Sequence, residues 1–224
     1  MRSKGNPLRS TIFAALCALP ALLLGSQVCV RAAEEAAPEP VQAIWKDQEI
    51  SFFFQTQTTF YSCSSLEAKL ERILKALGAT ARVKVRSVDC TSGRLPRMPR
   101  VVVEVHSPVE ATPEALAERD KSKGTRELAA RVRGEKEDPE ALAPFPAQWK
   151  HVQLKRGSVN LEPGDCELID ELRRKVLPKL AVRLVKDNTH CTPHQLTLGQ
   201  PQLEVLALTA LPKPDAPKKS EESK

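Results

Sequence analysis

The chain has 224 residues, with 34 lysines and arginines against 28 aspartates and glutamates, a net charge of +6 at neutral pH. Four of the basic residues and no acidic residue lie in the first 32 positions, so a chain without that segment carries +2. So small an excess gives no reason to expect a nucleic-acid partner, because proteins that bind nucleic acids present a strongly basic face. The chain also lacks GxSxG, HExxH and glycine-rich phosphate-loop motifs, so it carries no catalytic signature.

Residues 1–32 have the pattern of a secretory signal peptide. Basic residues precede an apolar run from Thr11 to Gly25, and Val30 and Ala32 are compact residues at the positions that a signal peptidase reads. The run of about fifteen residues is shorter than the roughly twenty that span a bilayer. No later stretch is as apolar. We therefore expect cleavage after Ala32 and an exported, periplasmic protein with no transmembrane segment after signal removal.

Residues 44–106 are expected to form a strand–helix–strand–strand unit. Residues 45–61 are rich in aromatic and threonine residues, which favour extended structure. Ser62 or Ser64 then caps a helix, and Ser64 with Glu67 fits a capping box. Gly78 ends the helix, and residues 101–105 predict a third strand. The helix has an apolar stripe of Leu66, Leu70, Ile73, Leu74 and Leu77, and the second strand has alternating Val83, Val85 and Val88.

Residues 107–147 interrupt this pattern. Thr112 and Pro113 mark the start of a helix, and Thr125–Arg133 before Gly134 predicts a second short one. Both stretches are rich in alanine, glutamate and arginine and hold few large apolar residues. We expect a largely exposed, partly helical connector.

Residues 148–211 repeat the landmarks of the first unit. Trp149, Cys166, Cys191 and Pro201 follow Trp45, Cys63, Cys90 and Pro99 at offsets of 104, 103, 101 and 102 residues. Likewise, Ile169, Val176, Leu177 and Leu180 take the places of Leu66, Ile73, Leu74 and Leu77. This order predicts an α+β protein made of two βαββ pseudo-repeats, whose helices pack on an antiparallel or mixed sheet. Whether the repeats share one sheet stays open. Residues 33–43 and 212–224 are expected to be a flexible lead-in and a disordered tail.

The mature chain would keep four cysteines, an even number that is typical of a disulfide framework in an exported protein. A helix of about 15 residues climbs roughly 22 Å and a strand of about seven returns roughly 23 Å. A chain that leaves Cys63 therefore comes back near it at Cys90, and the same lengths favour a Cys166–Cys191 pair. Reactive cysteines at the helix starts are the alternative, but they require reduced thiols in an oxidising compartment.

His190 and His194 flank Cys191, and the three side chains could together hold copper or zinc. If Cys191 is bonded in a disulfide, two histidines remain, which are too few for a tight site. Pro193 also opposes a helix that would align them. We favour exposed loop histidines beside a disulfide, expect no cofactor, and keep a metal-binding or redox loop as an alternative.

Two surfaces could bind a partner. Basic residues of the first unit could form one face, which in an envelope compartment would attract lipopolysaccharide, peptidoglycan or an acidic protein: Arg82, Lys84, Arg86, Arg94, Arg97 and Arg100. A solvated strand face is the alternative. Phe52, Phe53 and Phe54 cannot all face one side of a strand, so they form core if both faces are covered and otherwise leave an apolar patch for a partner.

These features favour an exported, non-enzymatic protein whose duplicated, disulfide-stabilised module binds another envelope protein or an anionic envelope polymer. Two alternatives stay open. One is a periplasmic metal-binding or redox protein that uses the His190–His194 loop. The other is an enzyme whose site lies in a cleft between the repeats, which needs no local motif, so the sequence neither predicts nor excludes activity.

Overall fold

The computed structural model describes residues 39–134, 142–199 and 201–212. The expected signal peptide, most of the lead-in and nearly all of the tail lie outside these segments. The first half contains β1 (Val41–Phe53), α1 (Cys63–Ala76), β2 (Thr80–Arg86) and β3 (Arg100–Glu110). The second half contains β4 (Phe145–Lys155), α6 (Cys166–Lys175), β5 (Val182–Asp187) and β6 (Gln202–Ala210). The intervening segments hold α2 (Val88–Thr91), α3 (Pro113–Lys121) and α4 (Lys123–Arg133).

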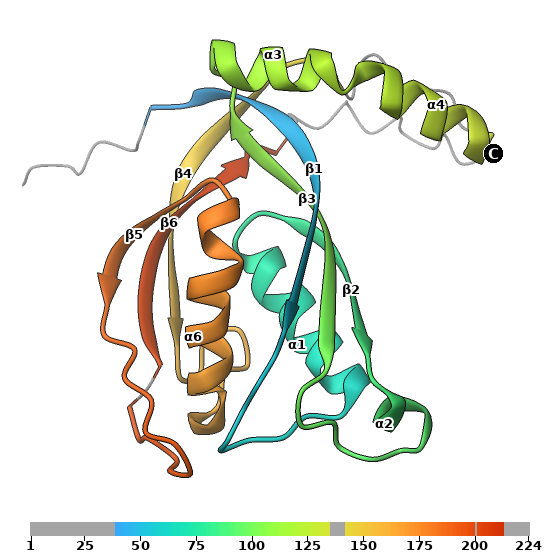
Figure 1. The fold of residues 1–224 in the computed structure, drawn as a ribbon. Coiled ribbons are helices and arrows are strands. Elements are labelled where there is room, and N and C mark those ends of the chain that lie inside the picture. The colour runs from blue at the N-terminus through green and yellow to red at the C-terminus, as the bar shows by residue number, and fades with distance from the viewer. Residues whose placement is uncertain (1–38, 135–141, 200, 213–224) are drawn as a thin grey trace, which may run out of the picture. The chain divides into compact units, whose positions relative to one another are not determined.

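The strands form one six-stranded antiparallel sheet in the order β2-β3-β1-β4-β6-β5 (Figure 1). The expected α+β class is confirmed, and the open question of one sheet or two is answered. The halves join where β1 and β4 pair over a short antiparallel stretch, with Val41 opposite Ala147 and Ala43 opposite Phe145. Within each half, a strand, a helix and two further strands follow in the same order, and the first strand of each half lies at the centre of the sheet.

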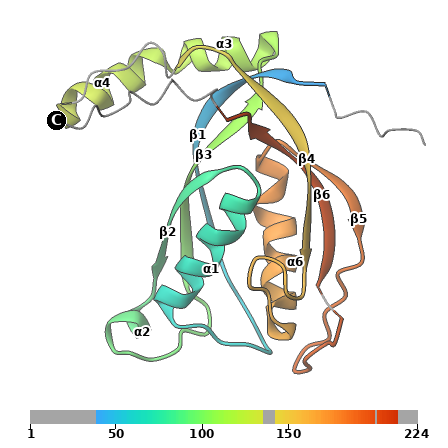
Figure 2. The same ribbon diagram turned by 180° about the vertical axis from the view of Figure 1, so that it is seen from behind.

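Helices α1 and α6 cover the same face of the sheet and share one apolar core (Figures 1 and 2). The periodicity of α1 places Leu66, Leu70, Ile73 and Leu74 on its buried side. Alternate residues of the strands meet them, among them Val101, Val103 and Val105 of β3. Phe52 and Phe54 belong to this core, whereas Phe53 points away and is 60% exposed. The three phenylalanines therefore divide between the two faces, as the strand geometry requires.

The start of α1 differs from the expected capping box. The side chain of Ser62, not Ser64, accepts a hydrogen bond from the Ser65 amide at 3.2 Å. The Glu67 carboxylate points instead to β2, where it accepts a hydrogen bond from the Val85 amide at 2.7 Å. The prediction was wrong because an unpaired amide on an edge strand offers a carboxylate a closer partner than its own helix terminus does.

Two strand predictions also need correction. Val88 was expected to continue the second strand, but it lies in α2 and is 87% exposed. The segment from residue 55 to residue 61 was expected to be extended, but β1 ends at Phe53. The polar side chains of that segment are used for contacts with the second half, described below.

The second-half helix is shorter than the pattern of apolar residues suggested. α6 ends at Lys175, and a 3-10 helix η2 (Leu177–Lys179) follows, because Pro178 has no amide hydrogen to continue an α-helix. Val176 and Leu177 are nevertheless buried in the shared core, as expected of core residues.

Two glycines allow the halves to approach closely. Gly78 follows α1 with φ of +79°, and a Cβ atom there would lie 2.6 Å from Thr209 Cγ2 and 2.8 Å from the Leu208 carbonyl oxygen of β6. Gly164 lies in the same way against the side chain of Thr59. Gly78 is therefore both the helix stop that the sequence predicted and a packing site between the halves.

The connector contains the two expected helices. Thr112 caps α3 by accepting a hydrogen bond from the Ala115 amide, and Pro113 occupies the first turn. α3 contacts the sheet through a Lys46–Glu118 ion pair at 2.9 Å. On α4, Leu128 and Val132 are 61% and 88% exposed. Residues 135–141 lie outside the described segments.

Candidate functional site

The six basic residues singled out in the sequence are all exposed: Arg82, Lys84, Arg86, Arg94, Arg97 and Arg100. Four of them share the face of the sheet that the core helices leave open. Alternation places Arg82, Lys84 and Arg86 on the side of β2 opposite to the buried Val83 and Val85. Arg100 lies directly opposite Arg86 in the β2–β3 pairing. The strand pairing thus brings Arg86 and Arg100 side by side at the end of the sheet where β2 leads into its loop.

The basic residues of this face have a carboxylate neighbour along β2 but not at its end. Lys84 forms an ion pair with Glu104 at 3.2 Å, and Arg82 lies opposite the same glutamate. For the arginines at and beyond the strand end, no ion pair is found within the described segments: Arg86, Arg94, Arg97 and Arg100. The unbalanced positive charge is therefore concentrated in residues 86–100, which we call the arginine loop.

The first disulfide holds the arginine loop to the body of the protein. Cys63, the first residue of α1, is bonded to Cys90 of α2 with their Cα atoms 5.7 Å apart. The loop is further fixed by hydrogen bonds from the Arg94 amide to the Asp89 carbonyl and from the Phe54 amide to the Pro99 carbonyl, both 3.0 Å long. The arginines are thus carried by a cross-linked loop and not by a free segment.

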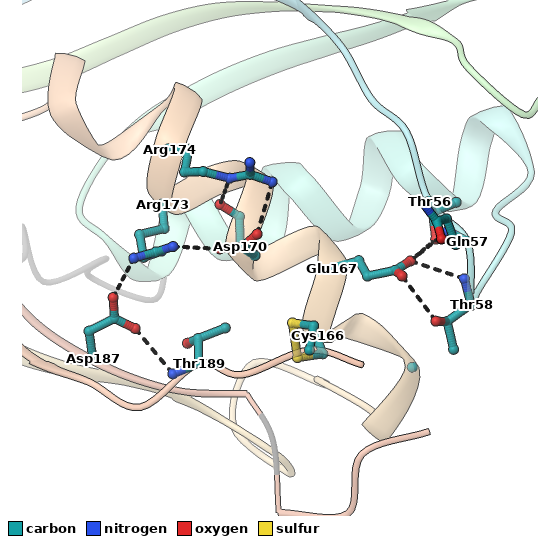
Figure 3. Close-up of a disulfide and its surroundings, with 12 residues drawn as sticks. Thr56, Gln57, Thr58, Cys166, Glu167, Asp170, Arg173, Arg174, Asp187 and Thr189 are labelled. Carbon is teal, nitrogen blue, oxygen red and sulfur yellow. Dashed lines mark hydrogen bonds and ion pairs between the residues drawn. A yellow bond between two sulfur atoms is a disulfide. The ribbon is translucent and has the colours of Figure 1, made fainter. Parts of the chain in front are cut away.

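The second disulfide joins Cys166, the first residue of α6, to Cys191 (Figure 3). Both expected pairings are therefore formed. His190 and His194 lie in the loop beside this bond and both are exposed, and His194 has a φ of +61°. Among the described residues, no group of three or more histidine, cysteine, aspartate or glutamate side chains is placed to hold a metal ion.

A buried polar cluster that the sequence did not indicate joins the two halves. The Asp165 carboxylate, 1% exposed, accepts hydrogen bonds from Lys69 Nζ at 2.7 and 2.8 Å and from the Tyr61 hydroxyl at 2.6 Å. The Glu162 amide donates to it at 2.7 Å. Burial and the hydrogen bond to Asp165 raise the pKa of Tyr61 far above its ordinary value, so the hydroxyl is a permanent donor. The opposite charges of Lys69 and Asp165 compensate each other within the cluster, and these contacts fix the position of one half against the other.

Glu167 makes a second polar contact between the halves (Figure 3). Its carboxylate accepts hydrogen bonds from the Thr56 hydroxyl, from the amides of Gln57 and Thr58, and from the Thr58 hydroxyl. Burial by itself raises the pKa of Glu167, but these hydrogen bonds outweigh it and hold the pKa below its ordinary value.

A pocket of about 470 Å³ lies between the sheet and the connector helices, next to an aromatic stack. Its wall includes Ile44, Trp45 and His106 of the sheet and Glu118 of α3. Both faces of the Trp45 ring are covered, by His106 at 4.5 Å and by Phe145 at 4.8 Å between ring centroids. The Trp45 ring therefore has a packing role, since no face of it is left on which a planar ligand could stack. The pocket lies beside the first half and the connector, not in the inter-repeat cleft that the enzyme hypothesis assumed.

Comparisons with known proteins identify no relative: no family model, no curated protein and no solved structure matches the chain. Within the described segments, no helix combines the length and apolar character needed to cross a bilayer. The two disulfides indicate an extracytoplasmic, oxidising compartment, because such bonds persist there and are rare in the cytosol.

Proposed function

We propose that the chain is an exported, non-enzymatic binding protein that recognises an anionic partner of the cell envelope through its arginine loop. The observation that carries the proposal is the set of four exposed arginines, without carboxylate partners among the described residues, on a loop that a disulfide cross-links. Uncompensated charge on a rigid support attracts a partner of opposite charge and loses little conformational entropy on binding.

We also infer that the two halves are copies of one βαββ module. Their strands lie in mirrored order from the centre of the sheet, and in each half the first residue of the helix is disulfide-bonded to the segment that follows the next strand. Trp45 and Trp149 occupy corresponding positions in the central strands β1 and β4. In this interpretation the binding surface is a specialisation of the first copy, because the loop after β5 in the second copy carries no arginine.

The proposal is tested with a polyanion that has no apolar part. Immobilised dextran sulfate should retain the purified, oxidised protein in a salt-dependent manner, and neutral dextran should not. Replacing the four arginines of the loop by alanine should weaken binding at least tenfold. The matched control removes four exposed lysines outside the loop, Lys121, Lys150, Lys175 and Lys179, and so changes the net charge equally. Equal losses in both variants, or no retention of the wild-type protein, would contradict the proposal.

A further inference from the structure

The arginine loop alternates its arginines with apolar residues that are also held in solvent. Val88, Leu95 and Met98 are 87%, 55% and 59% exposed. Phe53, which lies opposite Arg100 in the β1–β3 pairing, is 60% exposed. Four exposed large apolar residues thus lie among or opposite the four arginines in the chain and the sheet, and such exposure costs free energy in water and marks interaction surfaces.

Two buried prolines anchor the part of the loop that carries Leu95 and Met98. Pro96 and Pro99 are buried, whereas each residue between and beside them is exposed: Arg94, Leu95, Arg97, Met98 and Arg100. The Cys63–Cys90 disulfide fixes the other side of the loop. Proline also restricts the backbone on either side of each anchor. The exposure of Leu95 and Met98 is therefore a property of the fold.

Apolar residues of two other loops are also exposed. Phe60, in the segment between β1 and α1, is 41% exposed. The loop between β5 and β6 carries Leu196 and Leu198, which are 63% and 78% exposed. In both views that loop and the arginine loop lie at the same end of the sheet (Figures 1 and 2). Both halves therefore present apolar side chains at this end, and only the first half adds arginines.

We propose that this end of the protein binds the surface of an anionic phospholipid bilayer, with the arginines on lipid phosphates and Leu95, Met98 and Phe53 in the interfacial region. The proposal rests on the proposed function and names its partner. A purely ionic polymer would neutralise the arginines but leave the apolar side chains in water. A bilayer supplies a layer of negative charge next to an apolar phase, and peripheral proteins combine those two attractions.

Vesicle flotation tests the proposal with the full oxidised protein. The wild type should float with vesicles of phosphatidylglycerol and phosphatidylethanolamine and not with vesicles of phosphatidylcholine alone. Arg94→Ala with Arg97→Ala should lower the partition coefficient about 25-fold, from roughly 1 kcal/mol for each basic residue near an anionic surface. Leu95→Ser with Met98→Ser should lower it at least tenfold. The matched control, Leu128→Ser with Val132→Ser on α4, removes two apolar side chains that are more exposed than Leu95 and Met98, and it should leave the partition coefficient unchanged.

A second measurement reports insertion directly. A Leu95→Trp variant should be quenched by vesicles whose acyl chains carry bromine, and a Leu128→Trp variant should not. Thermal unfolding of each variant verifies that it is folded.

The possible outcomes separate the two proposals. If only the arginine variant loses vesicle binding and no quenching occurs, the surface recognises charge alone, so the bilayer is rejected and the proposed function stands. If the protein binds dextran sulfate but not anionic vesicles, the partner is an anionic polymer or an acidic protein. If it binds neither, both proposals fail.

Discussion

The two outer strands of the sheet, β2 and β5, protect their free edges by different means. On β2, the Val83 and Val85 amides donate to Glu71 and Glu67 of α1, at 2.9 and 2.7 Å. On β5, the pairing with β6 is interrupted between Leu184 and Lys186, and the strand is largely exposed. Carboxylates thus bind the free amides of β2, whereas an irregular pairing and charged side chains make β5 a poor edge for pairing with another strand.

The helices also begin differently in the two halves, although each begins at a disulfide. α1 has a local cap, the Ser62 side chain, and no acidic residue in its first turn. α6 begins next to Asp165 and Glu167, whose carboxylates bind residues of the first half. The second half thus supplies the carboxylates of Asp165 and Glu167 that bind the first half, while the first half carries the loop whose arginines form no ion pair among the described residues. The following variants test that division of roles, in order of expected effect.

The largest effect is expected at Asp165. Asp165→Ala leaves Lys69 without its buried partner and should lower the free energy of unfolding by about 3–5 kcal/mol, whereas Ser62→Ala at the start of α1 should lower it by about 1 kcal/mol. Urea denaturation followed by circular dichroism measures both. The double variant Lys69→Met, Asp165→Leu leaves no unpaired charge and should recover much of the loss. Similar values for Asp165→Ala and Ser62→Ala would show that the buried cluster does not join the halves.

Each half contains one disulfide at the start of its helix, so the effect of removing it can be compared directly between the halves. The sequence separations of the two disulfides are 27 and 25 residues, so replacing either pair by serine should cost about 3.5 kcal/mol in the chain-entropy estimate. Urea denaturation of the Cys63→Ser, Cys90→Ser protein and of the Cys166→Ser, Cys191→Ser protein measures the two values. A difference of more than about 2 kcal/mol would mean that the two halves do not respond as equivalent modules.

Glu167 should make stability depend on pH. Because its pKa is lowered in the folded state, its ionised form stabilises the protein above the unfolded value of 4.5, and this contribution is lost as the pH falls through the folded pKa. Glu167→Gln should therefore cost about 2 kcal/mol at pH 7 and progressively less below pH 4.5. Denaturation curves of both proteins from pH 7 to pH 3 measure the difference. A constant gap over that range would contradict the assignment, and Glu49→Gln on the exposed face is the control.

The smallest effect is expected at the edge of β2. Glu67→Gln or Glu71→Gln should cost about 1 kcal/mol each, since an amide oxygen replaces a charged acceptor. Hydrogen exchange should accelerate at the Val85 amide in the first variant and at the Val83 amide in the second. If both amides keep their protection, the carboxylates do not cover the edge. Exchange along β5 is the internal reference and should not change.

Features with local causes were predictable from the sequence. The spacing of Leu66, Leu70, Ile73 and Leu74 predicted a helix with one buried side, and all four are buried. Helix and strand lengths predicted both disulfides, because a helix and the strand that follows it cover similar distances in opposite directions. Thr112 and Pro113 predicted the start of α3, because a threonine cap and a proline in the first turn act within a few residues.

Features that depend on distant partners were not predictable. Lys69 and Asp165 are 96 residues apart in the chain, and neither has a motif that indicates the other. Glu67 fitted a helix cap by spacing but bonds β2. Among the site residues, the exposure of Arg82, Lys84 and Arg86 follows from strand alternation. The pairing of Lys84 with Glu104 and the lack of such a partner at Arg86 among the described residues depend instead on how β3 pairs.

The amino-acid sequence by itself determined the α+β class, the helices α1, α3, α4 and α6, and the two cross-links, because apolar periodicity, capping residues and chain length act over a few tens of residues. The tertiary structure decided the rest: the single sheet through β1 and β4, the buried cluster around Asp165, and the end of the sheet where arginines and apolar side chains meet. The partner of a charged side chain depends on which remote segments the sheet brings together, and that is a property of the whole fold.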